Sequence, residues 1–372
     1  MNPVSHLAIV IGSLRMGGAE RAAVHLANEF SSRGIRTDVV MVNAEGEFIA
    51  DLRKEVRIVD LHAKRTRKAG KAFANYLKEA QPEIIIAIQT HVQLMVLMTL
   101  HRHRSRVPVI LNEQSVFSVN VPASGIRNLL LRLLVKKYFP LAAAVAAVST
   151  ASAMDFTNCF PELNGRVDVI FNPVLPNGLP AFDCPVPVHP FFNNAEVPVV
   201  IAAGRLTPGK DFSTLIRAFA FVRNQKEARL IILGEGEERK QLEELSEELQ
   251  MKEDISLPGF ISNPMSMMNY ASVFVLSSKY EGLPFVLVEA MAAGCQVVST
   301  DCPGGAAEIL QDGKYGKLVP VGNAEKMAEA ILQALKNPAD RAFLRQRASE
   351  FTAAKAVNHY LDLINRIQKG NG

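Results

Sequence analysis

Residues 280–294 read Tyr-Glu-Gly-Leu-Pro-Phe-Val-Leu-Val-Glu-Ala-Met-Ala-Ala-Gly and predict a loop followed by a short helix. The apolar residues 271–277 before them predict a buried strand. Pro284 suits the first turn of the helix, because its missing N–H would have no partner there, and Gly294 suits the residue just past the helix end. A strand that leads into a helix through a glycine loop is typical of α/β folds.

The same stretch carries two carboxylates eight positions apart, which we call the carboxylate pair. Glu281 is expected in the loop and Glu289 about one turn inside the helix. A helix N-terminus has free N–H groups and a partial positive charge of about half a unit, so anions collect there. Carboxylates beside it can accept hydrogen bonds from hydroxyl groups. The pattern indicates a sugar nucleotide; a loop carboxylate and a solvated helix carboxylate are the alternative interpretation.

The composition is that of a globular protein with about two domains of 150 to 200 residues. The hydrophobic share of 48% and the charged share of 21% are ordinary. The chain shows no basic signal-peptide start and no apolar run of the ~20 residues that span a bilayer. The cysteines form no CxxC pair and are expected as reduced thiols of a cytoplasmic protein: Cys159, Cys184, Cys295 and Cys302.

Short apolar strands alternate with helices in both halves of the chain, which predicts doubly wound parallel sheets. Seven prolines between 172 and 198 mark the connection between the halves. We expect a Rossmann-like domain at 1–180, a second at 181–353, and a final helix 354–372 that packs back on the first. The expected strands are 7–11, 37–42, 56–60, 84–88, 109–111, 141–148, 167–171, 199–203, 229–233, 255–257, 273–276, 297–299 and 317–319.

Ligands of such sheets bind beyond the carboxyl ends of the strands. Gly17 and Gly18 end the loop after the first strand and allow a ligand to approach the backbone, although a tight turn explains them equally. This loop is neither GxGxxG nor a Walker A loop, so it does not support dinucleotide or ATP chemistry. His91 and the loop 112–115 follow two further strands. A polar group at a ligand site is one interpretation of His91, and a structural histidine is the other.

The second half opens with the cationic loop, residues 204–211, which begins Gly204-Arg205-Leu206 and contains Lys210. Arg205 offers a planar fork to two phosphate oxygens, and Lys210 offers a mobile point charge. Near a helix N-terminus these two cations would clamp a diphosphate; a surface loop with solvated cations is the alternative. The loops 234–237 and 258–260 follow the next two strands, where a nucleotide base could lie flat against the backbone.

Together, the cationic loop and the carboxylate pair resemble the retaining GT-B-fold glycosyltransferases of family 4, the glycosyl transferases group 1. Residues 17–21 and 169–172 also resemble that family, and the similarity extends over nearly the whole chain. The resemblance implies two Rossmann-like domains that face each other across a cleft. It also implies sugar transfer from a nucleoside-diphosphate sugar, most often a UDP-sugar, to a saccharide or lipid-linked acceptor in the synthesis of surface polysaccharide or lipopolysaccharide.

The resemblance implies a role for each residue on the donor side. Arg205 and Lys210 would hold the diphosphate, Glu289 the ribose hydroxyls, and Glu281 the hydroxyls of the donor sugar. The backbone near Phe260 would contact the base. The complete donor-binding set is Gly17, Gly18, Gly204, Arg205, Lys210, Phe260, Glu281, Gly282, Leu283 and Glu289.

In the first domain, the resemblance implies that Gly17 and Gly18 let this domain close over the donor phosphates. His91 would lie near the sugar and the acceptor as a positioning group. Many relatives carry a further histidine after the strand 109–111, where this chain has Glu113-Gln114-Ser115. This departure bears on the acceptor-side chemistry.

The expected mechanism needs no metal and no cofactor besides the nucleotide-sugar cosubstrate. The chain has no Asp-x-Asp triplet, so the two cations of the cationic loop would stabilise the departing diphosphate instead. Retention without a visible nucleophile favours departure and attack on the same face. The glycosidase arrangement of two flanking carboxylates does not fit, because Glu289 is assigned to the ribose. The expected catalytic residues are Glu281, Arg205, Lys210 and His91.

The distribution of charged and apolar residues also indicates a segment that could bind a membrane surface. Residues 1–170 carry a net charge of +7 and the remainder −3. Residues 126–139 are leucine-rich with four cations, and such a helix can lie on an anionic bilayer. The sequence favours the alternative, a core helix with a solvated basic edge. Under the membrane interpretation, the N-terminal half would make a peripheral contact with the inner face of the cytoplasmic membrane.

Three other functions compete with sugar transfer. A GT-B sugar-nucleotide epimerase or phosphorylase would keep the fold and change the chemistry, and fold alone does not decide between them. A non-catalytic sugar-nucleotide-binding subunit would keep the cationic loop without turnover. Nucleic-acid binding is not expected, because the cations are not interleaved with aromatic residues and no reader motif occurs.

Overall fold

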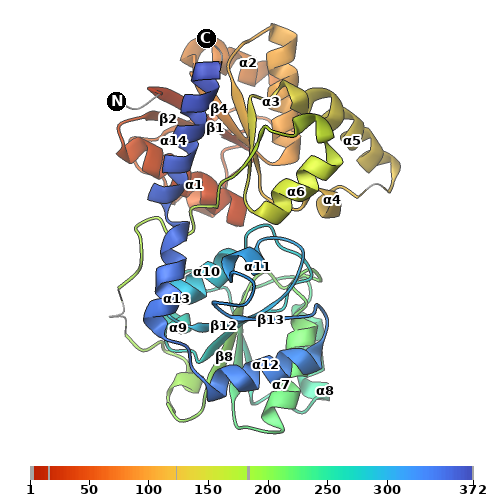
Figure 1. The fold of residues 1–372 in the computed structure, drawn as a ribbon, viewed down its shortest axis with the longest axis vertical. Coiled ribbons are helices and arrows are strands. Elements are labelled where there is room, and N and C mark those ends of the chain that lie inside the picture. The colour runs from red at the N-terminus through yellow and green to blue at the C-terminus, as the bar shows by residue number, and fades with distance from the viewer. Residues whose placement is uncertain (1–3, 16, 123, 182–184, 371–372) are drawn as a thin grey trace. The chain divides into compact units, whose positions relative to one another are not determined.

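The computed structural model describes residues 4–370 except Met16, Ala123 and residues 182–184. The chain forms two compact units (Figure 1). Unit 1 comprises Met1–Pro176 and Phe351–Gly372, and unit 2 comprises Asn177–Glu350. The sequence predicted the division at 180/181 and at 353/354, whereas the structure divides the chain at 176/177 and at 350/351. Cys184 lies outside the described residues; Cys159, Cys295 and Cys302 are free thiols.

Unit 1 contains a seven-stranded parallel sheet with the order β3-β2-β1-β4-β5-β6-β7. The order reverses between β1 and β4, and such a switch point is where ligands bind in open α/β sheets. Strand β4 is apolar throughout and fully buried, since helices cover both faces of the sheet. The strands are β1 (His6–Ile11), β2 (Arg36–Met41), β3 (Arg57–Asp60), β4 (Ile84–Ile88), β5 (Val109–Glu113), β6 (Ala144–Ala147) and β7 (Val167–Val169).

Two apolar cores flank this sheet, one beneath α1 and α14 and the other beneath α2, α3, α5 and α6. Helix α14, which forms the C-terminal part of the chain, contacts α1. Its Tyr360 is buried beside Phe30, with ring centroids 6.2 Å apart. The helices are α1 (Gly18–Ser32), α2 (Gly70–Ala80), α3 (Thr90–His103), α4 (Phe117–Asn120), α5 (Ile126–Tyr138), α6 (Thr150–Cys159) and α14 (Ala353–Gly370), with the short helices η1 (Glu47–Asp51), η2 (Thr66–Lys68), η3 (Phe139–Leu141), η4 (Pro161–Leu163) and η6 (Ser349–Phe351).

Unit 2 contains a six-stranded parallel sheet with the order β10-β9-β8-β11-β12-β13. Its order reverses between β8 and β11. The strands are β8 (Val199–Ala203), β9 (Arg229–Leu233), β10 (Ile255–Gly259), β11 (Val273–Leu276), β12 (Gln296–Thr300) and β13 (Lys317–Val319). The helices are α7 (Phe212–Arg223), α8 (Arg239–Glu248), α9 (Pro264–Met268), α10 (Phe285–Ala292), α11 (Ala306–Ile309), α12 (Ala324–Lys336) and α13 (Arg341–Ala348), with η5 (Pro190–Phe192).

Helix α10 follows the prediction closely at its C-terminus. Gly294 has φ 72° just past the cap residue Ala293, a conformation that glycine adopts without strain. Pro284 is the cap residue before α10 and lies one position outside the expected first turn. The helix is buried almost completely, and Glu289 is 1% exposed. The alternative of a solvated helix carboxylate is therefore wrong for Glu289.

The structure corrects two further expectations in unit 1. The expected strand 141–148 is shorter, because Phe139–Leu141 winds into η3 and β6 begins at Ala144. Helix α5 is not a core helix with a basic edge, because several of its leucines are exposed. Across the described part of the chain, none of the helices combines the length and the apolar character that crossing a membrane requires.

Candidate functional site

The switch point of unit 2 brings the cationic loop beside the loop 277–284. These segments follow β8 and β11, which are neighbours in the sheet. The hydroxyl of Ser277 donates to the carbonyl of Lys210 at 2.7 Å, and the N–H of Lys279 donates to the carbonyl of Gly209 at 2.8 Å. Two hydrogen bonds to consecutive carbonyls fix the backbone just before Phe212, where α7 begins.

Lys210 and Glu281 form an ion pair at the centre of this site. The Lys210 Nζ lies 2.6 Å from Glu281 Oε1, and the hydroxyl of Ser278 donates to the same oxygen at 2.6 Å. The two charged side chains are 26% and 10% exposed, so the pair is partly removed from water. A carboxylate thus orients the lysine and neutralises it. An incoming anion would compete with Glu281 for Lys210.

Three glycines allow neighbouring loops to pack backbone against backbone around this pair. A Cβ on Gly234 would lie 1.9 Å from the carbonyl oxygen of Gly204, and one on Gly236 would lie 2.2 Å from that of Leu206. A Cβ on Gly304 would lie 1.8 Å from the carbonyl oxygen of Glu281. Side chains cannot fit at such distances. The loops after β8, β9, β11 and β12 therefore form one close-packed assembly.

The other donor-side residues occupy the same carboxyl edge of the sheet. Gly282 accepts a hydrogen bond from the Gly305 N–H at 2.7 Å, and Leu283 is buried beside it. Glu289 lies buried in α10. Arg205 lies exposed on the cationic loop, and Phe260 is 57% exposed directly after β10. The structure thus links Gly204, Lys210, Glu281 and Gly282 by contacts, whereas it places Phe260 two strands away from β8.

At the switch point of unit 1, Gln89 bridges the loop after β1 and helix α1. Its Oε1 accepts a hydrogen bond from the Gly12 N–H at 3.2 Å, and its Nε2 donates to Glu20 Oε1 at 2.7 Å. Gln89 has φ 73° and ψ 128°, a strained conformation for a residue with a side chain. Strain of this kind concentrates at functional sites. Sequence reasoning missed Gln89 and Glu20, because each is an ordinary polar residue in the sequence.

The predicted residues of unit 1 surround this bridge. A Cβ on Gly17 would lie 2.2 Å from Glu20 Oε2, and Gly18 is the first residue of α1. His91 lies in the first turn of α3, and its Nε2 is 3.6 Å from the position of a Cβ on Gly12. Desolvation of the ring lowers the pKa of His91, so the imidazole is neutral at pH 7. The sequence-predicted histidine and glycines thus lie around one loop.

The loop after β5, where the sequence departs from the family, is bound to its own unit. Asn112 Nδ2 donates to the Tyr360 hydroxyl at 2.7 Å, and the amides of Gln114 and Asn172 exchange hydrogen bonds of 3.0 and 2.7 Å. Glu113 is buried and accepts from the Ser115 hydroxyl at 2.9 Å. Burial raises the pKa of Glu113 to about 7. No histidine takes part in these contacts of residues 112–115.

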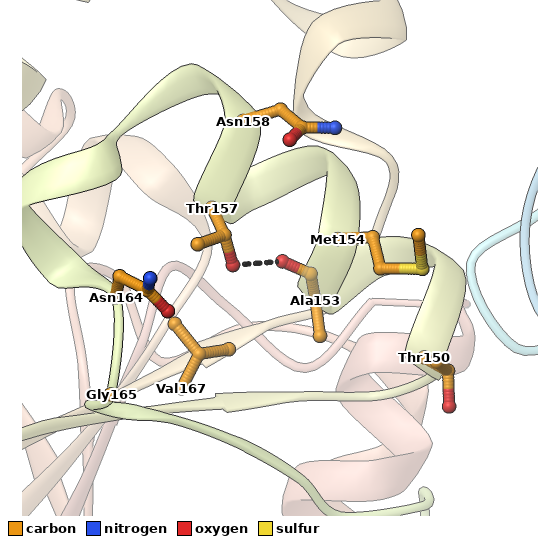
Figure 2. A pocket seen from close by; sticks show the side chains of 8 residues that line it. All are labelled: Thr150, Ala153, Met154, Thr157, Asn158, Asn164, Gly165 and Val167. Carbon is orange, nitrogen blue, oxygen red and sulfur yellow. Dashed lines mark hydrogen bonds between the residues drawn. The ribbon is translucent and has the colours of Figure 1, made fainter.

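A separate pocket of about 330 Å³ opens along α6 (Figure 2). Its walls are neutral, and the Thr157 hydroxyl inside it donates to the Ala153 carbonyl at 2.6 Å. The lining residues are Thr150, Ala153, Met154, Thr157, Asn158, Asn164, Gly165 and Val167. Since this lining includes none of the residues that the sequence predicts for the site, we do not assign the pocket to the donor.

Two family models match the chain, one in each half. Glycosyltransferase Family 4 matches residues 16–177, and Glycosyl transferases group 1 matches residues 189–351. A relative from Campylobacter jejuni is 30% identical over 256 residues, which are 68% of this chain and 67% of the relative. Its name is N-acetylgalactosamine-N,N'-diacetylbacillosaminyl-diphospho-undecaprenol 4-alpha-N-acetylgalactosaminyltransferase. The lipopolysaccharide core biosynthesis glycosyltransferase LpsE of Rhizobium meliloti is 34% identical over 46% of this chain and 50% of its own.

Among solved structures, the Anabaena protein HepE in complex with UDP-glucose superimposes with a TM-score of 0.71. The match covers 98% of both chains at 21% sequence identity, so the likeness is one of fold. Two parallel-sheet α/β units with such structural neighbours define the GT-B fold.

Proposed function

The chain belongs to the family of glycosyl transferases group 1, and from this premise we propose that it moves a sugar from a UDP-sugar to a saccharide or lipid-linked saccharide with retention of configuration. It is a glycosyltransferase with relatives in lipopolysaccharide and lipid-linked saccharide synthesis. The observation that carries the finer proposal is the ion pair of Lys210 and Glu281 among the close-packed loops of unit 2.

The proposed chemistry follows from the charge that develops on the leaving group. When the bond from the anomeric carbon to the phosphate breaks, the nucleoside diphosphate gains negative charge. Preorganised donors aimed at that charge lower the barrier, each by roughly 3 kcal/mol. We assign this work to Lys210 and Arg205, with no metal. In the free protein Glu281 holds Lys210 in the site at 2.6 Å, and the diphosphate takes the place of this carboxylate as the partner of Lys210.

Glu281 and Glu289 accept hydrogen bonds from the hydroxyl groups of the donor. Glu281 accepts hydrogen bonds from the donor sugar as the diphosphate draws Lys210 away. Glu289 is buried in α10, where a carboxylate that accepts ribose hydroxyls is protected from water. Exposed Phe260, with the backbone around it, offers a face for the base.

Unit 1 serves the acceptor. The lowered pKa of His91 keeps its ring neutral at pH 7, so it can accept or donate a hydrogen bond to a sugar hydroxyl. The bridge through Gln89 fixes the loop against which the ring lies. The Campylobacter relative is named for a diphospho-undecaprenol acceptor, which supports a lipid-linked acceptor here. A cytoplasmic enzyme at the inner face of the membrane remains part of the proposal.

Calorimetric titration of UDP tests the donor assignment. We expect UDP to bind the wild-type protein, and Glu289→Gln to weaken it about tenfold, which corresponds to about 1.4 kcal/mol. The substitution keeps the side-chain volume and removes the negative charge, so the melting temperature serves as the control for folding. Equal affinities of the two proteins would refute the ribose assignment.

The reaction itself is tested by the product. Incubation with a panel of UDP-sugars and saccharide acceptors in the presence of a chelator should give an elongated acceptor whose anomeric proton shows the donor's own configuration by NMR. An inverted product would refute retention, and activity that the chelator abolishes would refute metal independence. Epimerised donor without an elongated acceptor would favour the epimerase.

A further inference from the structure

Helix α5 exposes a continuous apolar face. Its exposed apolar residues are Ile126 (80%), Leu129 (53%), Leu130 (56%), Leu133 (56%) and Leu134 (40%). Leu141, just after the helix, is 52% exposed. In contrast, Val135 is buried in the core beneath α2, α3 and α6. Clustered leucines at this exposure mark an interaction surface, whereas scattered ones would not.

Helical geometry places these side chains on one side. Since successive residues turn by about 100°, the five exposed apolar residues of α5 fall within an arc of about 140°. Val135 lies opposite the middle of that arc. The inner side is held by specific contacts: the Arg132 guanidinium donates to the Val121 carbonyl at 2.8 Å and lies 5.6 Å from the centre of the Phe117 ring. The orientation of α5 is thus fixed by packing, with Leu131 against the core and the four exposed leucines pointing outward.

Cations border the apolar arc. Arg127 and Lys136 fall at its two edges, and Lys137 lies at its C-terminal end; all three are exposed. The end of α3 adds Arg102 and Arg104, both exposed, and the neighbouring His101 ring contacts Tyr138 of α5 with centroids 5.9 Å apart. Figure 1 shows α5 on the outside of unit 1, next to α3. The surface therefore combines an apolar strip with a positive border.

We propose that this face of α5 docks on an anionic phospholipid bilayer, with its leucines among the acyl chains and Arg127, Lys136 and Lys137 on the lipid phosphates. Thirteen residues are enough to lie in the interface and too few to span the bilayer. The inference extends the proposed function, since it supplies the surface that a lipid-linked acceptor requires.

Charge favours the bilayer over a second copy of the chain. A twofold contact through α5 would bring the same cations of both copies to one interface, and like charges there destabilise association. Anionic headgroups neutralise these cations instead. Each cation near the surface contributes about 1 kcal/mol to the free energy of membrane binding, which is roughly fivefold in affinity.

Co-sedimentation of the full chain with vesicles tests the proposal. We expect the wild-type protein to bind vesicles of phosphatidylcholine with phosphatidylglycerol, and to bind vesicles of phosphatidylcholine alone much more weakly. The triple substitution Leu129→Ser, Leu130→Ser and Leu133→Ser should lower binding at least about tenfold. The control Val186→Ser with Val188→Ser removes exposed apolar side chains elsewhere and should bind as the wild type does.

A second variant separates the charges from the leucines. Arg127→Gln with Lys136→Gln and Lys137→Gln should lower binding to the anionic vesicles on the order of a hundredfold and remove most of its salt dependence. Circular dichroism and the melting temperature establish that each variant folds. Equal binding of the leucine variant and the wild type would overturn the proposal.

Sedimentation velocity without lipid checks for the second copy. A monomer is expected. A dimer that the leucine substitutions dissociate, together with no vesicle binding, would assign α5 to self-association and overturn the membrane proposal. Vesicle binding uses no nucleotide and UDP titration uses no lipid, so this inference and the proposed function can fail independently.

Discussion

The switch points of the two units differ in charge and in strain. In unit 2, a lysine and a carboxylate meet at 2.6 Å, and three glycines let the surrounding loops touch backbone to backbone. In unit 1, a neutral amide bridge through Gln89 and the neutral ring of His91 occupy the corresponding place, and the strain falls on Gln89. One fold plan therefore carries a rigid site built on an ion pair, and a strained site in which an amide joins a backbone N–H to the carboxylate of Glu20.

Under the proposed function, this difference matches the two substrates. The leaving diphosphate gains charge in the transition state, so preorganised charges in unit 2 are effective. The acceptor offers a neutral hydroxyl, for which orientation matters more than charge. If the comparison is right, substitutions in unit 2 should affect turnover strongly, and substitutions in unit 1 should be felt through the acceptor and through stability.

The largest effect is expected for Lys210→Ala. Loss of the cation should lower kcat about 10²- to 10³-fold, because the developing charge loses a donor, while the melting temperature changes little. Arg205→Ala should act in the same direction. The control is Lys240→Ala, which removes a well-exposed lysine of α8 and should leave kcat unchanged. Wild-type turnover in Lys210→Ala would show that this cation does not stabilise the leaving diphosphate, and the proposed contrast between the two units would fail.

The rigidity of unit 2 is tested by Gly234→Ala. The new Cβ would meet the Gly204 carbonyl at 1.9 Å, and φ is 137°. We expect a loss of unfolding free energy on the order of 3 kcal/mol, measured by chemical denaturation. Gly178→Ala is the matched control in the same unit: φ is 79°, but nothing lies within 4 Å of the new Cβ, so about 1 kcal/mol is expected. Equal losses of unfolding free energy in the two variants would mean that the loops of unit 2 move apart to accommodate the new Cβ, and that they are not rigid.

The sequence was sufficient to locate the strands, because most of them contain a short apolar run, although the expected strand 141–148 begins too early and β3 and β7 mix polar with apolar residues. It did not predict α6, whose residues 150–159 show little apolar periodicity. A cap signal was present there: the Ser149 hydroxyl accepts from the Ser152 N–H at 3.1 Å and begins the helix. A serine before a polar segment is common in loops, so this signal alone is weak.

The contacts of the site could be predicted less well than its residues. Lys210 and Glu281 were both singled out, yet their pairing depends on β8 lying beside β11, and strand order is not written in local patterns. For α5, the amphipathic pattern showed an apolar stripe without showing which neighbour would cover it. The bridge by Gln89 depends on a backbone conformation that nothing in the local sequence signals.

The protonation of Glu113 in unit 1 can be tested by the pH dependence of stability. Burial raises its pKa from 4.5 to about 7. Between these values the folded protein holds a proton that the unfolded chain has lost, so stability falls as the pH rises, by up to about 3 kcal/mol above pH 7. Glu113→Gln cannot titrate. Its melting temperature relative to the wild type should therefore increase from pH 5 to pH 8. A constant difference would mean that Glu113 is not protonated in the fold.

The smallest and sharpest effect concerns the strain at Gln89. Gln89→Gly removes both bridging hydrogen bonds and also relieves the backbone at φ 73°, whereas Gln89→Ala removes the bonds and keeps the strain. The glycine variant should therefore be more stable than the alanine variant by about 1 kcal/mol, although glycine usually destabilises a fold.

Both variants should raise the acceptor KM by a similar factor and change the donor KM less, because both hydrogen bonds of the bridge lie within unit 1 and orient the loop beside His91. Steady-state kinetics with each substrate varied in turn measures this, and the Lys240→Ala protein again serves as the reference. An alanine variant at least as stable as the glycine variant would show that Gln89 is not strained. A change in the donor KM alone would reverse the division of roles between the two switch points.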